Sequence, residues 1–575
     1  MSACCVCCVA WLVLRWPRPI PHFHVVLLLV AWLRDYSLPI FNKKKTNVTA
    51  VMDRSPYGQF ALELIADIYA ALGDFAAVKQ DMRGTGWSQG NFSFWRSSAN
   101  DSYDTMQWIS EQSWSDGQVL TVGASADGLA SLEEVIDKPK WLIGQFVIFA
   151  SDEGHGVAFP GYAFREQLIT HWLKDTVKDA DYWIETIMSH EANGVWWHDL
   201  EGEYFDNVVH APAVFWGGWY DIFLHGNLAA YYDWQYRSME VAQGKSKLVI
   251  DPCGHCQDAS HYFTKNLIYG RILLPILLSF DLFEDTTKFS EGAKDVTFYV
   301  LGTNDDNAAG NYWTSLDTWP EYTPQNWYFH TNGSLSLAPP TATDAPTYKY
   351  DPTNPVPTIG GNNLFGSCGP KDQTPVLDRP DVLVYTSDPL PEPYVITGPL
   401  WSTLYVASSA NDTDFTVKLM VEDASGANIL IQDGIIRMRW REHELEPTPM
   451  VPGDVYEVQV GLWNTSFAIN TGNRIKVAIS SSNYPRFSIN PNNGLPLLAH
   501  GPNVTAMNTL HLGPATPSHF TLPMVKLSQL PEFHALDAMS DRFGLDRPTM
   551  TTMIEGFVNK LERMEHLPPM RGTRN

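Results

Sequence analysis

Positive charge and long apolar runs are both scarce in this 575-residue chain. Lysine and arginine together number 39 against 64 acidic residues, which gives a formal net charge of −25. Because such a surface repels phosphate backbones and anionic membranes, we expect no nucleic-acid partner. No run of 18 apolar residues occurs, so no firm membrane span is predicted. Only 18% of residues are charged while 13% are aromatic, which excludes a disordered chain and a coiled coil.

Cysteine is rare in the body of the chain, which holds Cys253, Cys256 and Cys368, while four others crowd the first ten residues. A structural zinc site needs four ligands, so these three cysteines do not predict one, and we expect no metal and no cofactor. Cys253 and Cys256 form a C-x-x-C pair. A disulfide between Cys368 and one of that pair stays open, since pairing does not follow from spacing.

The first 46 residues are atypical. An apolar run at 25–33 follows Arg15 and Arg18, which is typical of a signal peptide and also of a buried segment. N-x-S/T sequons exceed the roughly three or four that chance supplies in a chain of this length. We therefore expect a secreted glycoprotein, with N-terminal membrane association left open. The sequons begin at Asn47, Asn91, Asn100, Asn332, Asn411, Asn464 and Asn503.

The pattern of apolar residues divides the chain into regions. Strands alternate with helices at first, which predicts a parallel sheet covered on both faces. The expected strands are 48–52, 76–80 and 119–122, and the expected helices are 59–72, 103–111 and one from 126. Residues 155–206 have a helical pattern, and strands return at 213–216 and 247–250. After about 325, period-two strands separated by Gly, Pro and Asn favour a β-sandwich or jelly roll.

Three loops carry residues suited to nucleophilic catalysis. The segment Gly123-Ala-Ser-Ala-Asp-Gly128 lies between a strand and a helix, where a sharp turn exposes the Ser125 hydroxyl. Asp221 and His255 each follow a later strand, so the order Ser125, Asp221, His255 is that of the α/β-hydrolase triad. Because the carboxyl ends of parallel strands meet at one edge, we expect the three to converge there.

The chemistry needs these residue types. A serine hydroxyl is a poor nucleophile, so an imidazole must take its proton and return it to the leaving group. A carboxylate must hold the imidazole tautomer. His225 and Asp251 are the nearest competing residues, but His225 falls inside an expected helix and Asp251 comes too early at its strand end.

These segments resemble a family of serine hydrolases that includes cocaine esterase, glutaryl acylases and X-prolyl dipeptidyl-peptidases. The resemblance covers roughly residues 48–526 and is specific because many short motifs match together. The matching segments are 53–58, 80–86, 110–117, 123–128, 218–221, 251–255, 379–383, 412–415, 433–437 and 480–487.

The resemblance implies an α/β-hydrolase body, a helical cap and a galactose-binding-like jelly roll. It also implies that the Tyr57 hydroxyl donates to the oxyanion, with the backbone N–H of Ala126 as second donor. Taken alone, Tyr57 would be interpreted as a packing residue. Two departures stand out: relatives have strands before the segment of Tyr57, where this chain has 1–46, and they have tyrosine where this chain has Ala126.

Other features have structural interpretations. Asp81 and Arg83 are interpreted as a buried pair that orders the loop behind the nucleophile. Trp183, Trp196 and Trp197 either line the acyl pocket or pack the core of the cap. Cys253 and Cys256 are either small loop residues or part of a disulfide that braces the loop of His255.

We therefore expect a serine hydrolase that cleaves a small ester, amide or peptide substrate, as an esterase or acylase or as an X-prolyl dipeptidyl-peptidase. The alternative is an inactive relative that binds glycans or a partner through its jelly roll. The oligomeric state does not follow from the sequence. The expected units are an atypical segment 1–46, a catalytic domain 47–154 and 207–324, a cap 155–206, a jelly roll 325–526 and a C-terminal tail 527–575 with a helix.

Overall fold

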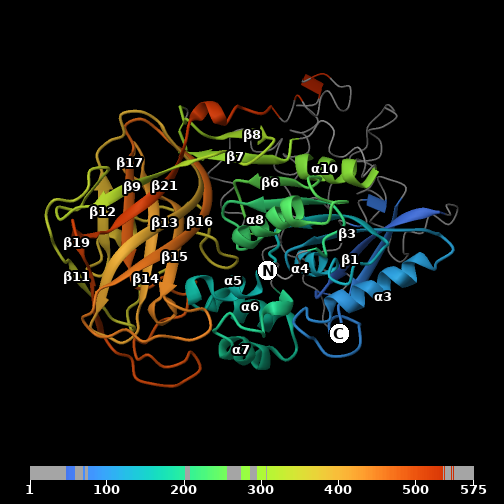
Figure 1. Cartoon of the computed structure of the whole chain (residues 1–575), viewed down its shortest axis with the longest axis horizontal. Coiled ribbons are helices and arrows are strands. Elements are labelled where there is room, and N and C mark those ends of the chain that lie inside the picture. Colours follow the sequence, from blue (N-terminus) through green and yellow to red (C-terminus); the bar gives the residue numbers. More distant parts are fainter. Residues whose placement is uncertain are drawn as a thin grey trace, which may run out of the picture.

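The computed structural model describes residues 47–57, 66, 69–70, 75–200, 207–255, 273–284, 294–305 and 307–534, with 537, 546 and 548–549 (Figure 1). Segment 1–46, most of the expected helix 59–72, Cys256 and the helix of the C-terminal tail lie outside this part of the chain.

A single sheet forms the body. Its strands lie in the order β2-β1-β3-β4-β5-β6-β7-β8, all parallel except the last. The expected strands are confirmed, and β4 is one that sequence analysis missed. Its side chains are largely buried on both faces, so it lacks the polar alternation that would reveal it. The bounds are β1 Val48–Ser55, β2 Phe75–Asp81, β3 Ser115–Ala124, β4 Leu142–Ile148, β5 Ala213–Gly218, β6 Lys247–Asp251, β7 Val296–Gly302 and β8 Tyr312–Leu316.

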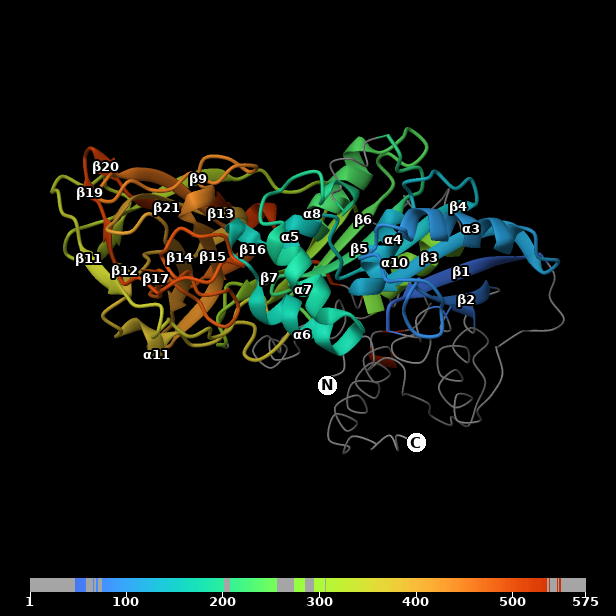
Figure 2. The same ribbon diagram turned by 90° about the horizontal axis from the view of Figure 1, so that it is seen from below.

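Helices cover this sheet and form an insertion beside it. Helices α3 (Ser98–Ser110) and α4 (Ala126–Glu133) pack near β3, while α8 (Leu224–Tyr232) and α10 (Leu273–Glu284) pack on β5. Between β4 and β5 the chain forms the helices expected of a cap: α5 (Gly154–Ala158), α6 (Glu166–Thr176) and α7 (Ala180–Ser189). Figure 2 shows these three helices at the junction of the body and the C-terminal strands.

The C-terminal region is rich in strands, as expected. One ladder runs β15-β14-β17-β12-β10, and a second is built on β13, which pairs with β16, β18 and β21. Strand β9 pairs with both β10 and β21. The bounds are β9 Thr323–Phe329, β10 Ser334–Ser336, β11 Thr347–Tyr350, β12 Leu383–Ser387, β13 Tyr394–Ser408, β14 Asp414–Glu422, β15 Asn428–Arg437, β16 Tyr456–Ile469, β17 Arg474–Ser480, β18 Ala506–Leu510, β19 Leu512–Gly513, β20 Thr516–Pro517 and β21 His519–Val525, with a short helix α11 Thr374–Leu377.

The two sheets touch directly. The end of β16 pairs in parallel with the end of β7, Phe467 opposite Leu301 and Ala468 opposite Gly302 (Figure 1). The side chains of β14 are buried on both faces of the sheet despite the alternating sequence of this strand. Lys418 on β14 is buried and donates to the Gln373 side chain at 2.7 Å.

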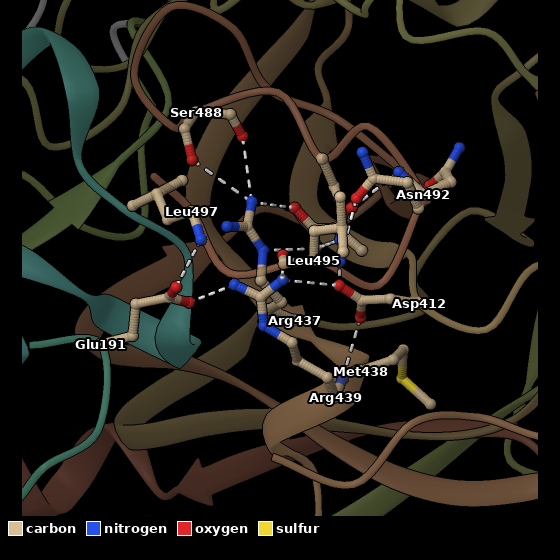
Figure 3. Close-up of polar contacts among 12 residues, drawn as sticks. Glu191, Asp412, Arg437, Met438, Arg439, Ser488, Asn492, Leu495 and Leu497 are labelled. Carbon is tan, nitrogen blue, oxygen red and sulfur yellow. Dashed lines mark hydrogen bonds and ion pairs between the residues drawn. The ribbon is translucent and has the colours of Figure 1, made fainter. Parts of the chain in front are cut away.

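A buried ionic cluster joins the cap to the C-terminal strands (Figure 3). Glu191, just after α7, accepts from the Leu497 amide at 2.6 Å and forms an ion pair with Arg439. Arg439 also contacts Asp412 at 3.1 Å and donates to the Leu495 carbonyl at 2.7 Å. One carboxylate of the cap therefore contacts both a strand end and the 490–503 loop of the neighbouring unit.

Replacing Glu191 by glutamine tests this attachment. The change leaves the Arg439 guanidinium short of one buried counter-charge, so we expect the fold to lose about 2 kcal/mol or more. A lower thermal midpoint and faster proteolysis within the cap would report it. Glu185→Gln, on the exposed side of α7, is the matched control and should change stability by less than about 0.5 kcal/mol. Equal behaviour of the two variants would contradict the role of the cluster.

Candidate active site

Ser125 lies on the expected strand-to-helix turn. Its backbone has φ 61° and ψ −124°, a conformation that a non-glycine residue adopts only under constraint. Its amide donates to the Ile148 carbonyl at 2.9 Å, and its own carbonyl accepts the Leu129 amide at 3.0 Å as α4 begins. These bonds fix the strained turn between β3 and α4, the geometry of a nucleophile elbow.

Two glycines allow α4 to lie close to the strands. A Cβ atom at Gly123 would lie 2.3 Å from the Asp127 carbonyl oxygen. At Gly128 it would lie 2.7 Å from the Ala150 Cβ and 3.1 Å from the Ile148 carbonyl oxygen. The glycine usually found two residues after the serine is displaced by one place here, and Gly128 provides the close approach of helix to sheet.

Asp221 and His255 form a buried pair. They follow β5 and β6, and the carboxylate oxygen Oδ2 of Asp221 contacts Nδ1 of His255. The other carboxylate oxygen accepts the Phe223 amide at 2.7 Å, which fixes the carboxylate. With Nδ1–H directed to Asp221, the second ring nitrogen, Nε2, is the proton acceptor. Nε2 is buried and has no hydrogen-bond partner among the residues that the structure describes.

The serine shares one sheet edge with this pair. Ser125, Asp221 and His255 follow β3, β5 and β6, and β4 lies between β3 and β5. Phe149, which follows β4, lies between the strand of the serine and the histidine loop. Its ring centroid is 5.6 Å from that of His255. Within the described ranges Ser125 makes no hydrogen bond to His255. Such bonds are often long without substrate and tighten when it binds.

The loops of Asp221 and His255 support each other through backbone contacts. The Trp219 amide donates to the Asp251 carbonyl at 2.9 Å and the Tyr220 amide to the Cys253 carbonyl at 3.1 Å. A Cβ atom at Gly218 would lie 2.1 Å from the Cys253 carbonyl oxygen. The loops can approach this closely only because residue 218 has no side chain. The same holds for Gly254, where an added Cβ atom would lie 2.4 Å from the Tyr220 carbonyl oxygen.

The competing residues lie elsewhere. His225 is half-exposed on α8 and contacts Glu153 at 2.5 Å. Asp251 accepts the Cys253 amide at 2.8 Å and the Trp216 indole at 3.2 Å. Neither of them is the partner of the His255 ring.

Both residues expected to supply oxyanion donors belong to the aromatic cluster next to the serine turn. Ala126 is the first residue of α4, where backbone N–H groups have no partner within the helix and favour negative charge. Tyr57 follows β1, the strand next to β3. Its hydroxyl accepts a hydrogen bond from the Trp172 indole of the cap at 2.8 Å. A hydroxyl that accepts one bond still has its own hydrogen to donate.

Aromatic side chains of the body loops and the cap pack together with Ala126 and Phe223. Trp183 stacks on Phe94 with ring centroids 5.7 Å apart. Trp197 is fully buried and donates to the His190 carbonyl at 2.9 Å, which makes it a core residue of the cap. The cluster also contains Phe92, Trp95, Trp172, Trp196, Ile222, Leu364, Phe365 and Leu497.

One expectation about the loop behind the serine is wrong. Asp81 and Arg83 do not form a buried pair: Arg83 is half-exposed and pairs with Asp101, and Asp81 accepts the Trp87 amide at 2.7 Å. The buried arginine here is Arg54, which donates to the Ser98 carbonyl at 2.9 Å and lies 3.8 Å from Glu134. Side-chain orientation decides such pairs, and proximity in sequence does not reveal it.

Three residues far away in the sequence hold the loop of Asp221, and sequence analysis missed all of them. The Asn362 side chain donates to the Asp221 carbonyl at 2.8 Å, and the Gln432 side chain donates to the Trp219 carbonyl at 2.8 Å. From the cap, Arg165 donates to the Ile222 carbonyl at 2.8 Å. No local pattern marks these residues, because each acts across more than 50 positions.

The cysteines divide between two states. Cys253 is a buried thiol, and Cys368 takes part in a disulfide whose other half lies outside the described residues. The disulfide that was left open therefore does not include Cys253. In the part of the chain with described structure, no group of three or more His, Cys, Asp or Glu could hold a metal, and no helix is long and apolar enough to cross a membrane.

One sizeable hollow lies away from this edge. A hollow of about 510 Å³ lies along β2 and is lined by polar groups that include Lys79, Arg83 and Asp104. It contains none of the five expected site residues. This hollow therefore does not coincide with the candidate site formed by Ser125, Asp221 and His255.

Comparisons with known proteins agree with this geometry. The model of the X-Pro dipeptidyl-peptidase (S15 family) matches residues 34–181 and 163–257, and that of the X-Pro dipeptidyl-peptidase C-terminal non-catalytic domain matches 287–521. Cocaine esterase of Rhodococcus sp. (strain MB1 Bresler) is 29% identical over 568 residues, covering 83% of this chain and 94% of the esterase.

Two solved structures show the same fold. An aminopeptidase from a marine sediment Thaumarchaeota archaeon is 20% identical with a TM-score of 0.72, and an α-amino acid ester hydrolase is 22% identical with a TM-score of 0.70. Each match covers 84% of this chain and 93% of the other. The expected α/β-hydrolase body with a strand-rich C-terminal domain is thereby confirmed, while the galactose-binding-like assignment stays a prediction.

Gly128→Ala tests the packing of the serine turn. The added Cβ would overlap the Ala150 side chain, so we expect a loss of about 1–3 kcal/mol, measured as a lower unfolding midpoint. Combining it with Ala150→Gly should restore part of that loss, because the closest contact is removed. Gly461→Ala is the control, since a Cβ there meets nothing within 4 Å. A Gly128→Ala protein as stable as the control would contradict the close approach.

Proposed function

The chain belongs to the serine hydrolase family that contains cocaine esterase and the X-Pro dipeptidyl-peptidases, and from this premise we propose that Ser125 is the residue that becomes acylated. The family assignment makes the chain a serine hydrolase of esters or amides. The single observation that carries the residue assignment is the buried Asp221–His255 contact beside the strained turn of Ser125.

In this proposal the Ser125 Oγ attacks the substrate carbonyl while Nε2 of His255 takes its proton. The carbonyl oxygen becomes an oxyanion that accepts hydrogen bonds from the Ala126 amide and the Tyr57 hydroxyl. His255 then gives the proton to the leaving alcohol or amine, and the acyl-enzyme remains. Water repeats these steps against the ester and releases the acid. Asp221 holds the imidazole and stabilises its cationic form.

The aromatic cluster favours one substrate class within the family's range. It packs Trp95 and Phe223 around Ala126, so a substrate group bound next to Ala126 would meet apolar rings, which favour apolar groups. A peptide's N-terminal ammonium would lose its hydration there at considerable cost. We therefore favour small esters with an apolar acyl group, as the similarity to cocaine esterase also suggests, over X-Pro peptides. The inactive alternative finds no support in the comparisons.

Labelling with a fluorophosphonate tests the nucleophile without a guess about substrate. We expect one adduct, located on Ser125 by peptide mapping, because an imidazole-activated serine attacks the phosphorus centre. Ser125→Ala should abolish both the adduct and ester hydrolysis, while the fold stays intact. A matched control is Ser110→Ala, at the exposed end of α3, which should label normally. Labelling or turnover retained in Ser125→Ala would contradict the assignment.

We also propose that the protein follows a secretory route. Six of the seven sequon asparagines are exposed, all except the half-buried Asn464 on β16. The disulfide at Cys368 also suits an oxidising compartment.

Expression in a eukaryotic secretory host tests this proposal. We expect a glycan on Asn332, which lies in an exposed turn. The hydroxyl of Ser334, the third residue of this sequon, lies 2.7 Å from the Asn332 Oδ1. Digestion with peptide N-glycosidase should lower the mass of the wild type by one glycan more than that of Asn332→Gln. A protein that stays inside the cell without glycan would contradict the route.

A further inference from the structure

Two stacked tryptophans contact the two residues that are expected to supply the oxyanion donors. Trp95 lies in the loop between β2 and α3, and Trp172 lies on α6 of the cap. Their rings stack with centroids 5.4 Å apart and planes at 27°. The Trp95 indole N–H donates to the Ala126 carbonyl at 3.1 Å, while the Trp172 indole N–H donates to the Tyr57 hydroxyl at 2.8 Å.

The Trp172 hydrogen bond is directed at a hydroxyl whose orientation would affect catalysis. A phenol hydroxyl rotates about its C–O bond, so its hydrogen can point in several directions. A donor placed at one lone pair excludes the orientations in which the hydrogen points toward that donor. It also polarises the hydroxyl, which strengthens the bond that the hydroxyl donates in turn.

We propose that Trp172 is a positioning residue of the oxyanion site: its indole N–H orients the Tyr57 hydroxyl, and its stacking on Trp95 couples that hydroxyl to the turn of Ala126. This inference rests on the proposed function and deepens it. A helix of the cap thus takes part in stabilising the oxyanion, in addition to covering the site. Trp172 acts through Tyr57 and does not itself touch the reacting atoms.

The edge contact between the rings supports a fixed geometry. Tyr57 and Trp172 meet with centroids 6.3 Å apart at 80°, so the indole edge that carries the N–H approaches the phenol. Trp95 is buried on the other side of Trp172, and a rotation of the Trp172 ring would break its stack on Trp95. Packing and hydrogen bonding therefore select the same orientation.

Trp172→Phe removes the N–H and keeps an aromatic ring. With an aryl ester as substrate we expect kcat to fall about tenfold while KM changes less than about threefold, since the oxyanion forms only in the transition state. Tyr57→Phe should lower kcat by about a hundredfold. The double variant should be no slower than Tyr57→Phe alone, because the indole has no hydroxyl left to orient.

Trp234→Phe is the matched control. It also removes an indole N–H bonded to a side-chain oxygen, that of Gln145 at 3.1 Å, but in the body core away from the site. Its kcat should equal that of the wild type. If Trp172→Phe does not fold, replacing Trp172 with β-(3-benzothienyl)alanine keeps the bicyclic ring and removes only the N–H, and the same fall in kcat is expected.

The outcomes separate the inference from the function on which it rests. Losses that multiply in the double variant, or a change in KM alone, would mean that Trp172 only packs, and the inference would fail while the hydrolase assignment stands. An unaffected Tyr57→Phe enzyme would overturn both the oxyanion role of Tyr57 and the inference. If the folded wild type is not labelled by the fluorophosphonate, the proposed function itself would be contradicted.

Discussion

The buried contact between Asp221 and His255 is the interaction on which the site depends. A carboxylate removed from water needs partners on both oxygens, and it has them in the His255 ring and the Phe223 amide. Its loop is held in turn by Asn362 of the C-terminal domain and by Arg165 of the cap. The position of the Asp221 loop is thus set by three units together: the body, the cap and the C-terminal domain.

The cap has a similar double role. Glu191 joins it to the C-terminal strands, and Trp172 connects it to the hydroxyl beside the serine. These two polar contacts limit how far the cap helices can shift without disturbing the Tyr57 hydroxyl. Substrate entry must therefore be compatible with a cap that is hydrogen-bonded at both of these points.

Sequence alone led to the three candidate catalytic residues because each follows a recognisable parallel strand. Ser125, Asp221 and His255 could be placed at one edge from that rule. Tyr57 needed the family resemblance, since a lone tyrosine after a strand carries no chemistry by itself. Arg83 was misassigned and Asn362 and Trp172 were missed, because their partners are set by tertiary packing between distant segments. Strand β4 was missed because it is buried on both faces and its sequence has no period of two.

The small side chain at Ala126 changes the shape of the site without removing its chemistry. Relatives were expected to have a tyrosine there, and the oxyanion bond needs only the backbone N–H. Ala126 is nearly fully buried among Phe94, Trp95 and Phe223, so its neighbours already cover the methyl group. The space beside residue 126 is thus filled by rings from other segments. Because these rings enclose residue 126, we expect substrate preference to depend on Trp95 and Phe223 more than on the Ala126 methyl group.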